Sequence, residues 1–430
     1  MKYCSIVIIF LCIAEQANAK EIVVEPNGKV SSLQEAVRLA DSGDVVRVRG
    51  GEFHLKEFTI EKTISLIGEN FPVLDGDGRN EILVIKAKHV LIEGFLFRNA
   101  GVNYLYENAA VRVVNTSHCT IRNNRFYANF FAIYLSKSHD CKIQHNFIEA
   151  TADRESNSGN GIHLWYSNRA TISDNEIFGH RDGIYFEFVE GSLIERNRSE
   201  RNLRYGLHFM FSHRCKYRNN VFRRNSAGVA VMYTKDVEMT NNLFELNWGE
   251  ASYGLLLKDI SRSVIERNEF VENTVAILAE GCEKTRIADN DFRRNGWALR
   301  IMGNSIENVI TRNNFLENLF DVATNTSQNQ NQFDGNFWSA YQGYDLNRDG
   351  FGDVPYRPVR LFSYIVEKQS AALVLLRSAL IDVLEAAERV FPLLTPKTLT
   401  DNRPAMRLIK RETHSVPPKL TQQHKEYAAE

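Results

Sequence analysis

The chain has 430 residues, of which 43% are hydrophobic and 24% charged, and these proportions exclude a disordered chain and a multi-span membrane protein. Its 52 Lys and Arg residues balance 53 Asp and Glu residues, and a net charge of −1 argues against partners such as nucleic acid or anionic lipid. At about 150 residues per domain, the length alone suggests roughly three domains. Asparagine is concentrated: 34 of the 39 lie between Asn99 and Asn347, which is typical of a repeat.

The first 19 residues have the features of a cleaved signal peptide. An apolar run over 6–13 is too short to span a bilayer, and it precedes Ala17-Asn18-Ala19, a small-x-small cleavage motif. We therefore expect an exported mature chain that begins at Lys20. Cleavage leaves four cysteines in a compartment where disulfides are allowed, namely Cys119, Cys141, Cys215 and Cys282.

Residues 31–53 predict an N-terminal cap. A short amphipathic helical segment runs into a Gly-Asp turn and then into an apolar strand. A stack of strands needs such a cover, because its first layer would otherwise expose core side chains and an unpaired edge.

From residue 119 onward a short phrase returns, as in CTIRNNRF, CKIQHNFI and SVIERNEF, with an apolar residue three places before an asparagine. Intervals of 22, 29, 22, 23, 22, 26, 22 and 23 residues separate Asn124, Asn146, Asn175, Asn197, Asn220, Asn242, Asn268, Asn290 and Asn313. This period predicts a right-handed parallel β-helix over 20–338, with three short strands per coil. The repeat thus favours one long solenoid over the three domains that the length alone suggests. Coils about 4.8 Å apart would stack these asparagines in a column whose amides bond from coil to coil.

A second phrase lies between the first ones and alternates with period two: AIYLS, GIHLW, GIYFE, GLHFM, GVAVM and GLLLK. The first and third residues after the leading Gly or Ala are apolar, so they are predicted to face the core, and the second and fourth face outward. The inner outward column is Tyr134, His163, Tyr185, His208, Ala230 and Leu256. The outer outward column is Ser136, Trp165, Glu187, Met210, Met232 and Lys258.

Residues 339–362 form an Asp/Gly-rich loop region. Asp345, Asn347 and Asp349 alternate before Gly350, which matches the first half of a calcium loop. Tyr356 stands where the bidentate glutamate of such a loop would be. The pattern predicts a calcium site at Asp345, Asn347 and Asp349, and the alternative is an Asp/Asn/Gly-rich turn without metal.

The C-terminal part divides into two segments. Residues 363–396 are rich in Ala and Leu with interspersed charges, which predicts an amphipathic helical segment that caps the last coil or docks onto a partner. Residues 397–430 contain Pro404, Pro417 and Pro418 among scattered charges and read as a flexible tail.

The outward columns suggest a metal site. Thioether and imidazole ligands suit Cu(I), and His208, Met210 and Met232 would lie on one face of consecutive strands. We therefore expect a transient copper site there, with the alternative that these side chains only line a half-buried face. Cys119 and Cys141 lie on consecutive coils, where a disulfide, a second soft metal site or simple burial all remain open.

No catalytic residues are predicted. Glycosidases need paired carboxylates, whereas Glu187 and Glu280 of the outward face are four coils apart. Alginate epimerases carry an Asp-Pro-His-Asp run after Tyr-Gly-Ile, but here Tyr205-Gly206-Leu207 precedes His208-Phe209-Met210-Phe211. We expect a protein that is not an enzyme.

Four phrases resemble the NosD family: DGIYFEFVEGS, YGLHFMFSHRC, GVAVMYT and NFWSAYQGYDLNRDGFGDVPYRP. The resemblance covers the chain from about Val23 to Pro396. It implies a periplasmic β-helix protein that matures nitrous oxide reductase together with an ABC transporter, made of a permease and an ATPase, and a copper chaperone lipoprotein.

The resemblance thus predicts an accessory protein for copper-centre assembly that contacts the apo-reductase and meets the membrane only through its permease partner, by way of the segment after Ser363. It identifies neither a copper ligand set nor the cargo of the transporter, for which copper and a sulfur species both fit. The alternatives are a periplasmic polysaccharide lyase or epimerase, suggested by the fold alone, and an adhesin-like spacer.

Overall fold

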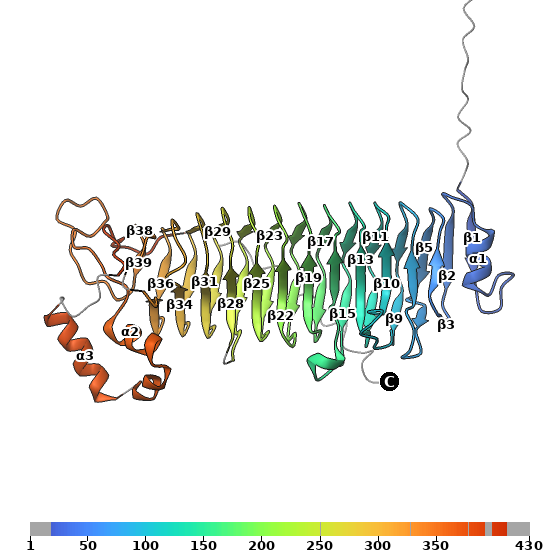
Figure 1. Cartoon of the computed structure of the whole chain (residues 1–430). Helices are drawn as coiled ribbons and strands as arrows, with labels where there is room; N and C mark the ends of the chain where they lie inside the picture. Colours follow the sequence, from blue (N-terminus) through green and yellow to red (C-terminus); the bar gives the residue numbers. More distant parts are fainter. Residues whose placement is uncertain (1–18, 250, 327, 377, 392–397, 411–430) are drawn as a thin grey trace, which may run out of the picture.

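The computed structural model describes residues 19–410 except 250, 327, 377 and 392–397. The signal peptide predicted over 1–19 therefore lies almost wholly outside the described residues. The fold is a right-handed parallel β-helix, as predicted, in which three parallel sheets run along one straight solenoid (Figure 1). Helix α1 (Leu33–Leu39) lies at one end and the C-terminal helices lie at the other.

Sheet A has one strand from each coil, and its central apolar side chains, most of them isoleucine, point into the core. Its 14 strands are β1 (Glu21–Val24), β2 (Val45–Arg49), β5 (Ser65–Glu69), β8 (Leu91–Glu93), β11 (Thr120–Arg122), β14 (Lys142–Gln144), β17 (Thr171–Ser173), β20 (Leu193–Glu195), β23 (Lys216–Arg218), β26 (Glu238–Thr240), β29 (Val264–Glu266), β32 (Arg286–Ala288), β35 (Val309–Thr311) and β38 (Gln332–Asp334).

Sheet B follows sheet A in each coil after a single sharp corner. Its 13 strands are β3 (Glu52–His54), β6 (Val73–Asp75), β9 (Leu96–Arg98), β12 (Arg125–Tyr127), β15 (Phe147–Glu149), β18 (Glu176–Phe178), β21 (Arg198–Glu200), β24 (Val221–Arg223), β27 (Leu243–Glu245), β30 (Glu269–Val271), β33 (Asp291–Arg293), β36 (Asn314–Leu316) and β39 (Phe337–Trp338).

Sheet C contains the second sequence phrase and the longest strands. Its 12 strands are β4 (Phe58–Ile60), β7 (Leu83–Ile85), β10 (Ala109–Val114), β13 (Phe131–Ser136), β16 (Ile162–Trp165), β19 (Asp182–Glu187), β22 (Tyr205–Met210), β25 (Ala227–Met232), β28 (Tyr253–Lys258), β31 (Val275–Glu280), β34 (Trp297–Ile301) and β37 (Phe320–Ala323).

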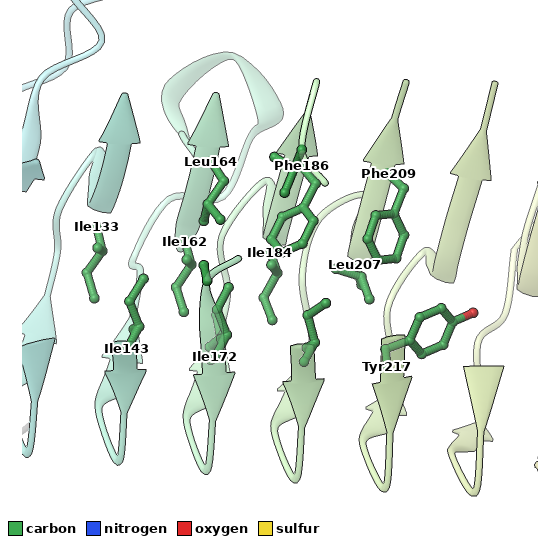
Figure 2. Packing of buried hydrophobic residues seen from close by; sticks show 14 of the residues in the cluster. Ile133, Ile143, Ile162, Leu164, Ile172, Ile184, Phe186, Leu207, Phe209 and Tyr217 are labelled. Atoms are coloured by element: carbon green, nitrogen blue, oxygen red, sulfur yellow. The ribbon is translucent and has the colours of Figure 1, made fainter. Parts of the chain in front are cut away.

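The core is a set of columns, because each inward position repeats at the same place in the next coil. Ile162, Ile184 and Leu207 follow one another along sheet C and face Ile143 and Ile172 of sheet A (Figure 2). All these side chains are fully buried. The period-two pattern of the second phrase therefore predicted the core-facing side of sheet C correctly.

The predicted asparagine column forms a hydrogen-bonded ladder at the corner between sheets A and B. In each step the Oδ1 atom of one asparagine accepts from the backbone N–H and the side-chain Nδ2 of the asparagine one coil earlier. Asn197 donates to Asn220 over 2.9 and 3.0 Å, and Asn220 donates to Asn242 over 3.0 and 3.0 Å. Each Nδ2 also donates to a backbone carbonyl, as Asn220 does to Ile194 at 3.0 Å.

A second asparagine ladder was not predicted. It runs along the corner between sheets B and C, and its members are Asn202, Asn225, Asn247, Asn273, Asn295 and Asn318. Each lies five residues after a member of the first ladder, so the signal is present in the sequence. Both ladders satisfy buried polar groups at corners where the strand hydrogen bonds stop.

The N-terminal cap is formed by α1. The backbone N–H of Glu35 in its first turn donates to the hydroxyl oxygen of Ser32, the residue that precedes the helix, at 3.2 Å. Leu33, Ala36 and Val37 of this helix are buried in the main core. The helix therefore covers the open first coil, as the amphipathic pattern predicted.

The C-terminal helices are α2 (Leu361–Lys368), the 3-10 helix η2 (Ser370–Leu375) and α3 (Ala379–Val390). Helix α2 packs on the outer face of sheet C, where Phe362 contacts Phe320 with ring centroids 5.9 Å apart. Arg300 of β34 donates to Glu367 of α2 at 2.8 Å, and the Ser363 hydroxyl donates to the Val322 carbonyl at 3.2 Å. This end of the sheet C face is therefore closed by the chain itself.

The prediction of a flexible tail is wrong for residues 398–410. Asp401 is fully buried and accepts hydrogen bonds from the backbone of Gly335, from Asn336 Nδ2 and from Trp338 Nε1, at 3.0–3.1 Å. It thereby takes the place of the next asparagine in the first ladder. The composition of this segment resembles a linker, but one buried carboxylate anchors it, and residues 411–430 lie outside the described residues.

We predict that Asn220→Ala destabilises the protein by about 3 kcal/mol or more, because the buried backbone N–H of Asn197 loses its acceptor, and Nδ2 of Asn197, Oδ1 of Asn242 and the Ile194 carbonyl each lose one hydrogen bond. Chemical denaturation measures the change in the free energy of unfolding. The control is Lys216→Ala on the same coil, whose exposed ion pair with Glu238 is worth at most about 1 kcal/mol. Equal effects of the two substitutions would contradict a structural role for the ladder.

We also predict that Asp401→Ala opens the C-terminal end locally. Buried donors of β39 and of the corner between β38 and β39 would lose their acceptor, at about 1–3 kcal/mol for each group left unpaired. Hydrogen exchange should become at least about tenfold faster at Gln332–Trp338 and remain unchanged in β16–β22. The neighbouring Asn402→Ala serves as the control, since Asn402 is exposed.

Candidate functional site

The candidate site lies on the outer face of sheet C, between β13 and β28. The register places Tyr134, His163, Tyr185, His208 and Ala230 side by side on consecutive strands, in the order of the inner outward column. The outer outward column is likewise in register, with Met210 paired to Met232. Because the strands are parallel and in register, these side chains stand in rows about 4.8 Å apart.

The inner column is more buried than an outward face of a solenoid would be. His163 and His208 are only 5% and 6% exposed, and the outer column is half-buried. Neighbouring rings shield the histidines: the ring centroids of Tyr134 and His163 are 4.4 Å apart, and those of Tyr205 and His208 are 4.7 Å apart. The face is therefore an apolar and aromatic environment with imidazoles set into it.

The loop 101–108 covers the N-terminal part of this face. Arg112 of β10 donates to the Tyr106 and Glu107 carbonyls at 2.8 and 2.6 Å, and it also pairs with Glu81. Tyr104 packs edge-on against Phe130. This loop accounts for part of the burial that the alternation pattern alone could not predict.

His208 has a carboxylate partner behind it. Its Nδ1 atom is 3.5 Å from Oδ2 of Asp182, which is fully buried and is itself held by Arg204, with Nε of Arg204 2.8 Å from Oδ1. Burial alone would raise the pKa of Asp182, but the hydrogen bonds and charge of Arg204, together with His208, outweigh it and lower the pKa. A charged Asp182 favours the tautomer of His208 with the proton on Nδ1, which leaves Nε2 with its lone pair.

Asp182 and Arg204 are two residues of the site that were not predicted from the sequence. They are 22 residues apart, which is one coil, so the repeat period could have revealed that they face each other. Asp182 is the first residue of β19, and Arg204 immediately precedes β22, the next strand of sheet C. The feature that indicates this pair in the sequence is the spacing of two opposite charges by one coil, and not a sequence motif.

Met210 and Met232 lie beside each other, but they do not share one environment. Met232 packs against the apolar cluster of Ala230, Leu256 and Leu278, whereas Met210 follows His208 on β22. The structure thus brings His208, Met210 and Met232 to one face, and it also gives Met232 apolar neighbours that a packing role would require.

Buried polar atoms without a partner are concentrated here. Among the described residues, such atoms include Oδ1 of Asn160, Nε2 of His163, both ring nitrogens of His180, Nε2 of His208 and Nε of Arg181. The Nδ1 atom of His163 is 3.2 Å from the side-chain amide of Asn160. Burial, reinforced by the Arg181 cation, lowers the pKa of His163 to about 3, and burial lowers the pKa of His180 to about 4. Neutral imidazoles with a free ring nitrogen are the form that can bind a metal ion.

The predicted calcium loop forms a turn. Oδ1 and Oδ2 of Asp345 accept from the backbone N–H groups of Asp349 and Gly350 at 3.2 and 3.0 Å, and Oδ1 of Asn347 accepts from Asp349 at 3.0 Å. Oδ1 of Asp349 accepts from Phe351 at 2.8 Å. These contacts explain the Asp/Asn/Gly pattern as a chain of side-chain-to-backbone turns, and calcium binding by this loop stays a prediction.

The cysteines of the described residues are all buried and free. Cys119 and Cys141 precede paired strands β11 and β14 and are neighbours on consecutive coils. The hydrogen bond between their thiols lowers the pKa of Cys119, and the same pairing together with burial raises the pKa of Cys141. Their column is a column of small buried side chains, as the spacing indicated.

A different group of potential ligands lies on sheet B. His54, Asp75 and Asp77 place ligand atoms within 4.8 Å of one another, the one such group of His, Cys, Asp or Glu found over the described residues. Asp75, however, is already held by Arg98 and by the side-chain amide of Asn99 at 3.0 Å. The group is explained by these pairs.

Solved structures with the same architecture place the chain among the parallel β-helix proteins. A family 28 exopolygalacturonase of Yersinia enterocolitica superposes with a TM-score of 0.59 at 10% identity, over 74% of this chain and 79% of the enzyme. The surface adhesin PfbA of Streptococcus pneumoniae superposes with a TM-score of 0.55 at 12% identity, over 68% of this chain and 87% of the adhesin. At these identities the likeness shows the fold alone.

Sequence relatives define the family. The family model described as "Periplasmic copper-binding protein (NosD)" matches residues 148–343, which include His163, Asp182, His208, Met210 and Met232 of the candidate site. Two proteins named "Probable ABC transporter binding protein NosD" are each 30% identical to the chain: one from Stutzerimonas stutzeri over 84% of this chain and 86% of its own length, and one from Pseudomonas aeruginosa over 82% and 86%. The chain belongs to the NosD family.

The family is thus one of periplasmic copper-binding proteins, and its description is that of a binding protein rather than an enzyme. Over the residues that the structure describes, no helix is long and apolar enough to cross a membrane.

We predict that the buried histidines make the protein acid-sensitive. His163 and His180 have pKa values lowered from 6.5 to about 3 and about 4, so their contribution to stability is present above pH 6.5 and is lost as the pH falls toward 4. Replacing either residue with Gln should flatten the loss of stability between pH 6.5 and pH 4, as measured by denaturant unfolding at several pH values. The exposed His145 replaced with Gln is the control, and an acid limb unchanged in His163→Gln would contradict the assignment.

Proposed function

We propose that the protein is a periplasmic accessory factor that handles copper transiently during assembly of the copper centres of nitrous oxide reductase. The observation that carries the proposal is the strip of soft donors on sheet C within a chain of the NosD family. The proposal assigns no catalytic residue, since the paired acids needed for glycoside chemistry are not identified on this face.

The donors fit a Cu(I) ion by their chemistry. His208 offers a buried ring nitrogen without a partner, and the thioethers of Met210 and Met232 are soft ligands on neighbouring strands. Asp182 and Arg204 support the imidazole from behind, in the manner of carboxylates that orient metal-binding histidines. Copper would be the cargo of this site. Because the site has few strong ligands, a bound ion can leave it again.

The partners we propose are an ABC transporter of permease and ATPase, a copper chaperone lipoprotein and the apo-reductase. The names of the two relatives support the transporter. The C-terminal helices offer a surface for the permease, because Leu380, Val383 and Val390 of α3 are 51%, 64% and 69% exposed along one side of the helix. This surface would hold the protein at the membrane through its partner.

A calcium ion at Asp345, Asn347 and Asp349 is proposed as a separate, structural feature of the loop that follows β39. The alternating oxygen ligands support it. Its expected role is to fix the loop against the C-terminal segment, where Gly352 donates to the Pro404 carbonyl at 2.8 Å.

The test of the copper site is anaerobic titration with Cu(I) in the presence of a competing chelator. We expect Met210→Ala and His208→Ala each to weaken binding at least about tenfold, a change of about 1.4 kcal/mol, because each removes one of few ligands. Met239→Ala is a matched control, since Met239 is fully buried in the core and its loss affects stability and not the strip. Unchanged Cu(I) affinity in the first two variants would reduce the strip to a packing or docking face.

The cellular role is tested by a deletion strain grown under denitrifying conditions. We expect nitrous oxide reductase without its full copper content, and restoration by the wild-type chain but not by the double variant Met210→Ala/Met232→Ala. A fully metallated reductase in the deletion strain would overturn the proposal. Unsaturated uronate released by the purified protein, and lost in Glu187→Gln, would instead support the lyase alternative.

A further inference from the structure

A group of buried polar atoms without partners lies where the chain enters sheet C in the coils of β16 and β19. Oδ1 of Asn160, Nε2 of His163 and Nε of Arg181 have no hydrogen-bond partner among the described residues. Asn160 is fully buried, and His163 is almost so. Buried polar atoms are nearly always paired in folded proteins, so this group indicates a place that another molecule occupies.

The strand register brings these side chains together. It sets Gly159 beside Arg181 on the next coil, and the backbone N–H of Arg181 donates to the Gly159 carbonyl at 2.9 Å. The side-chain nitrogen of Asn160 is 3.2 Å from Nδ1 of His163. Burial and then the charge of Arg181 lower the pKa of His163, so the guanidinium lies near the imidazole. We call Asn160, His163 and Arg181 the entry cluster.

The repeat departs from its rule at this point. The interval from Asn146 to Asn175 is 29 residues, against 22 in the coils before and after it, and the insertion brings in Asn160. His180 stands five residues after Asn175, where other coils have a member of the second asparagine ladder, and both of its ring nitrogens are without a partner. The ladder is thus interrupted beside the entry cluster, which indicates a requirement other than folding.

Arg181 has a positive charge without a counter-ion. The neighbouring carboxylate, Asp182, is used by Arg204, whose Nε donates to Oδ1 at 2.8 Å and which also pairs with Oδ2. In the part of the chain that the structure describes, no acceptor lies on the guanidinium of Arg181, and only its Nε is buried. Glu155 of the inserted loop is exposed, so water screens it. Two guanidinium cations and one carboxylate therefore leave one positive charge, which is costly at a half-buried position.

The donors of the entry cluster fit a carboxylate. Since Nδ1 of His163 accepts from the amide of Asn160, the single proton of the neutral ring is on Nε2, which makes Nε2 a donor. A guanidinium presents parallel N–H groups to the two oxygens of a planar anion. One negative charge balances Arg181, whereas sulfate or phosphate brings more charge than the cluster offers. Ordered water would pair the single atoms and would leave the charge unbalanced.

The remaining atom of the cluster adds a second requirement. Oδ1 of Asn160 is an acceptor, so it needs an N–H or O–H donor and does not pair with a bare anion. A carboxylate with an N–H group beside it meets both requirements. The last residue of a peptide chain has this chemistry, and so does a free acylated amino acid.

We propose that the entry cluster binds a carboxylate that has a neighbouring N–H group. Arg181 and Nε2 of His163 donate to the carboxylate, and Oδ1 of Asn160 accepts from the N–H. The site uses neither His208 nor the methionines of the strip, so this inference does not rest on the proposed copper-handling function.

The test on the wild-type mature chain is calorimetric titration at pH 7 with three small probes. N-acetylglycine has both groups, N-acetylglycinamide lacks the carboxylate, and N-acetylsarcosine lacks the N–H. We expect N-acetylglycine to bind at least about tenfold more tightly than the amide and at least about threefold more tightly than the sarcosine compound. These comparisons need no variant, so they do not depend on the folding of one.

The variant that tests the cluster is Arg181→Gln, which keeps N–H donors and removes the charge. We expect it to bind N-acetylglycine at least about tenfold more weakly than the wild type, with Arg181→Lys between the two, because lysine keeps the charge without the planar fork. The matched control is Arg201→Gln, since Arg201 is exposed and its guanidinium stacks over Phe178, and this variant should bind as the wild type does.

Equal binding of N-acetylglycine and its amide, unchanged binding by Arg181→Gln, or no binding of any probe overturns the proposal. A hexapeptide that ends in glycine distinguishes the two sources of the ligand. Binding as tight as that of N-acetylglycine supports the end of a protein chain, and binding of N-acetylglycine alone supports a free acid. The affinity of Arg181→Gln for Cu(I) should equal that of the wild type, so the failure of this proposal and that of the copper site are separate results.

Discussion

The hydrogen bond from one coil to the next is the interaction on which the rest of this molecule depends. The strands supply it along the sheets, and the two asparagine ladders continue it around the corners, where backbone groups would otherwise be buried without partners. Because both Oδ1 and Nδ2 of an interior asparagine are used, no other side chain can replace it there without loss, whereas Asp401, which only accepts, ends the first ladder. This constraint fixes the register, and the register in turn brings His208, Met210 and Met232 to one face.

In a solenoid of this kind, inward side chains determine stability and outward side chains are available for function. Inward positions are restricted to apolar residues of similar size in successive coils, as in the series Ile162, Ile184 and Leu207. Outward positions on sheet C are free to vary, and here they carry imidazole, thioether, carboxylate and aromatic groups. The pair of buried Asp182 and half-buried Arg204 lies between the inward and outward positions, and burial of Asp182 costs desolvation that an apolar residue would avoid. Its presence is consistent with a positioning role for His208.

Much of the fold followed from the sequence because a repeat reports the same local rule many times. The period near 22 residues gave the architecture, and the alternation of the second phrase gave the facing of Met210 and Met232. The depth of burial of His163 and His208 could not be predicted, since it depends on ring contacts with neighbouring aromatic side chains. Residues 398–410 were misread because a single buried group, Asp401, anchors a segment whose composition is that of a linker.

Both ends of the sheet C face are closed by parts of the same chain. Helix α2 packs on β37, and the loop 101–108 is tied to β10 through Arg112, so the strip between them has a length set by the number of coils it contains. Each coil adds one row of outward side chains about 4.8 Å further along. The gain or loss of a whole coil would therefore change the number of side-chain rows that a bound molecule contacts. It would leave the side chains of the remaining rows, helix α2 and the 101–108 loop unchanged.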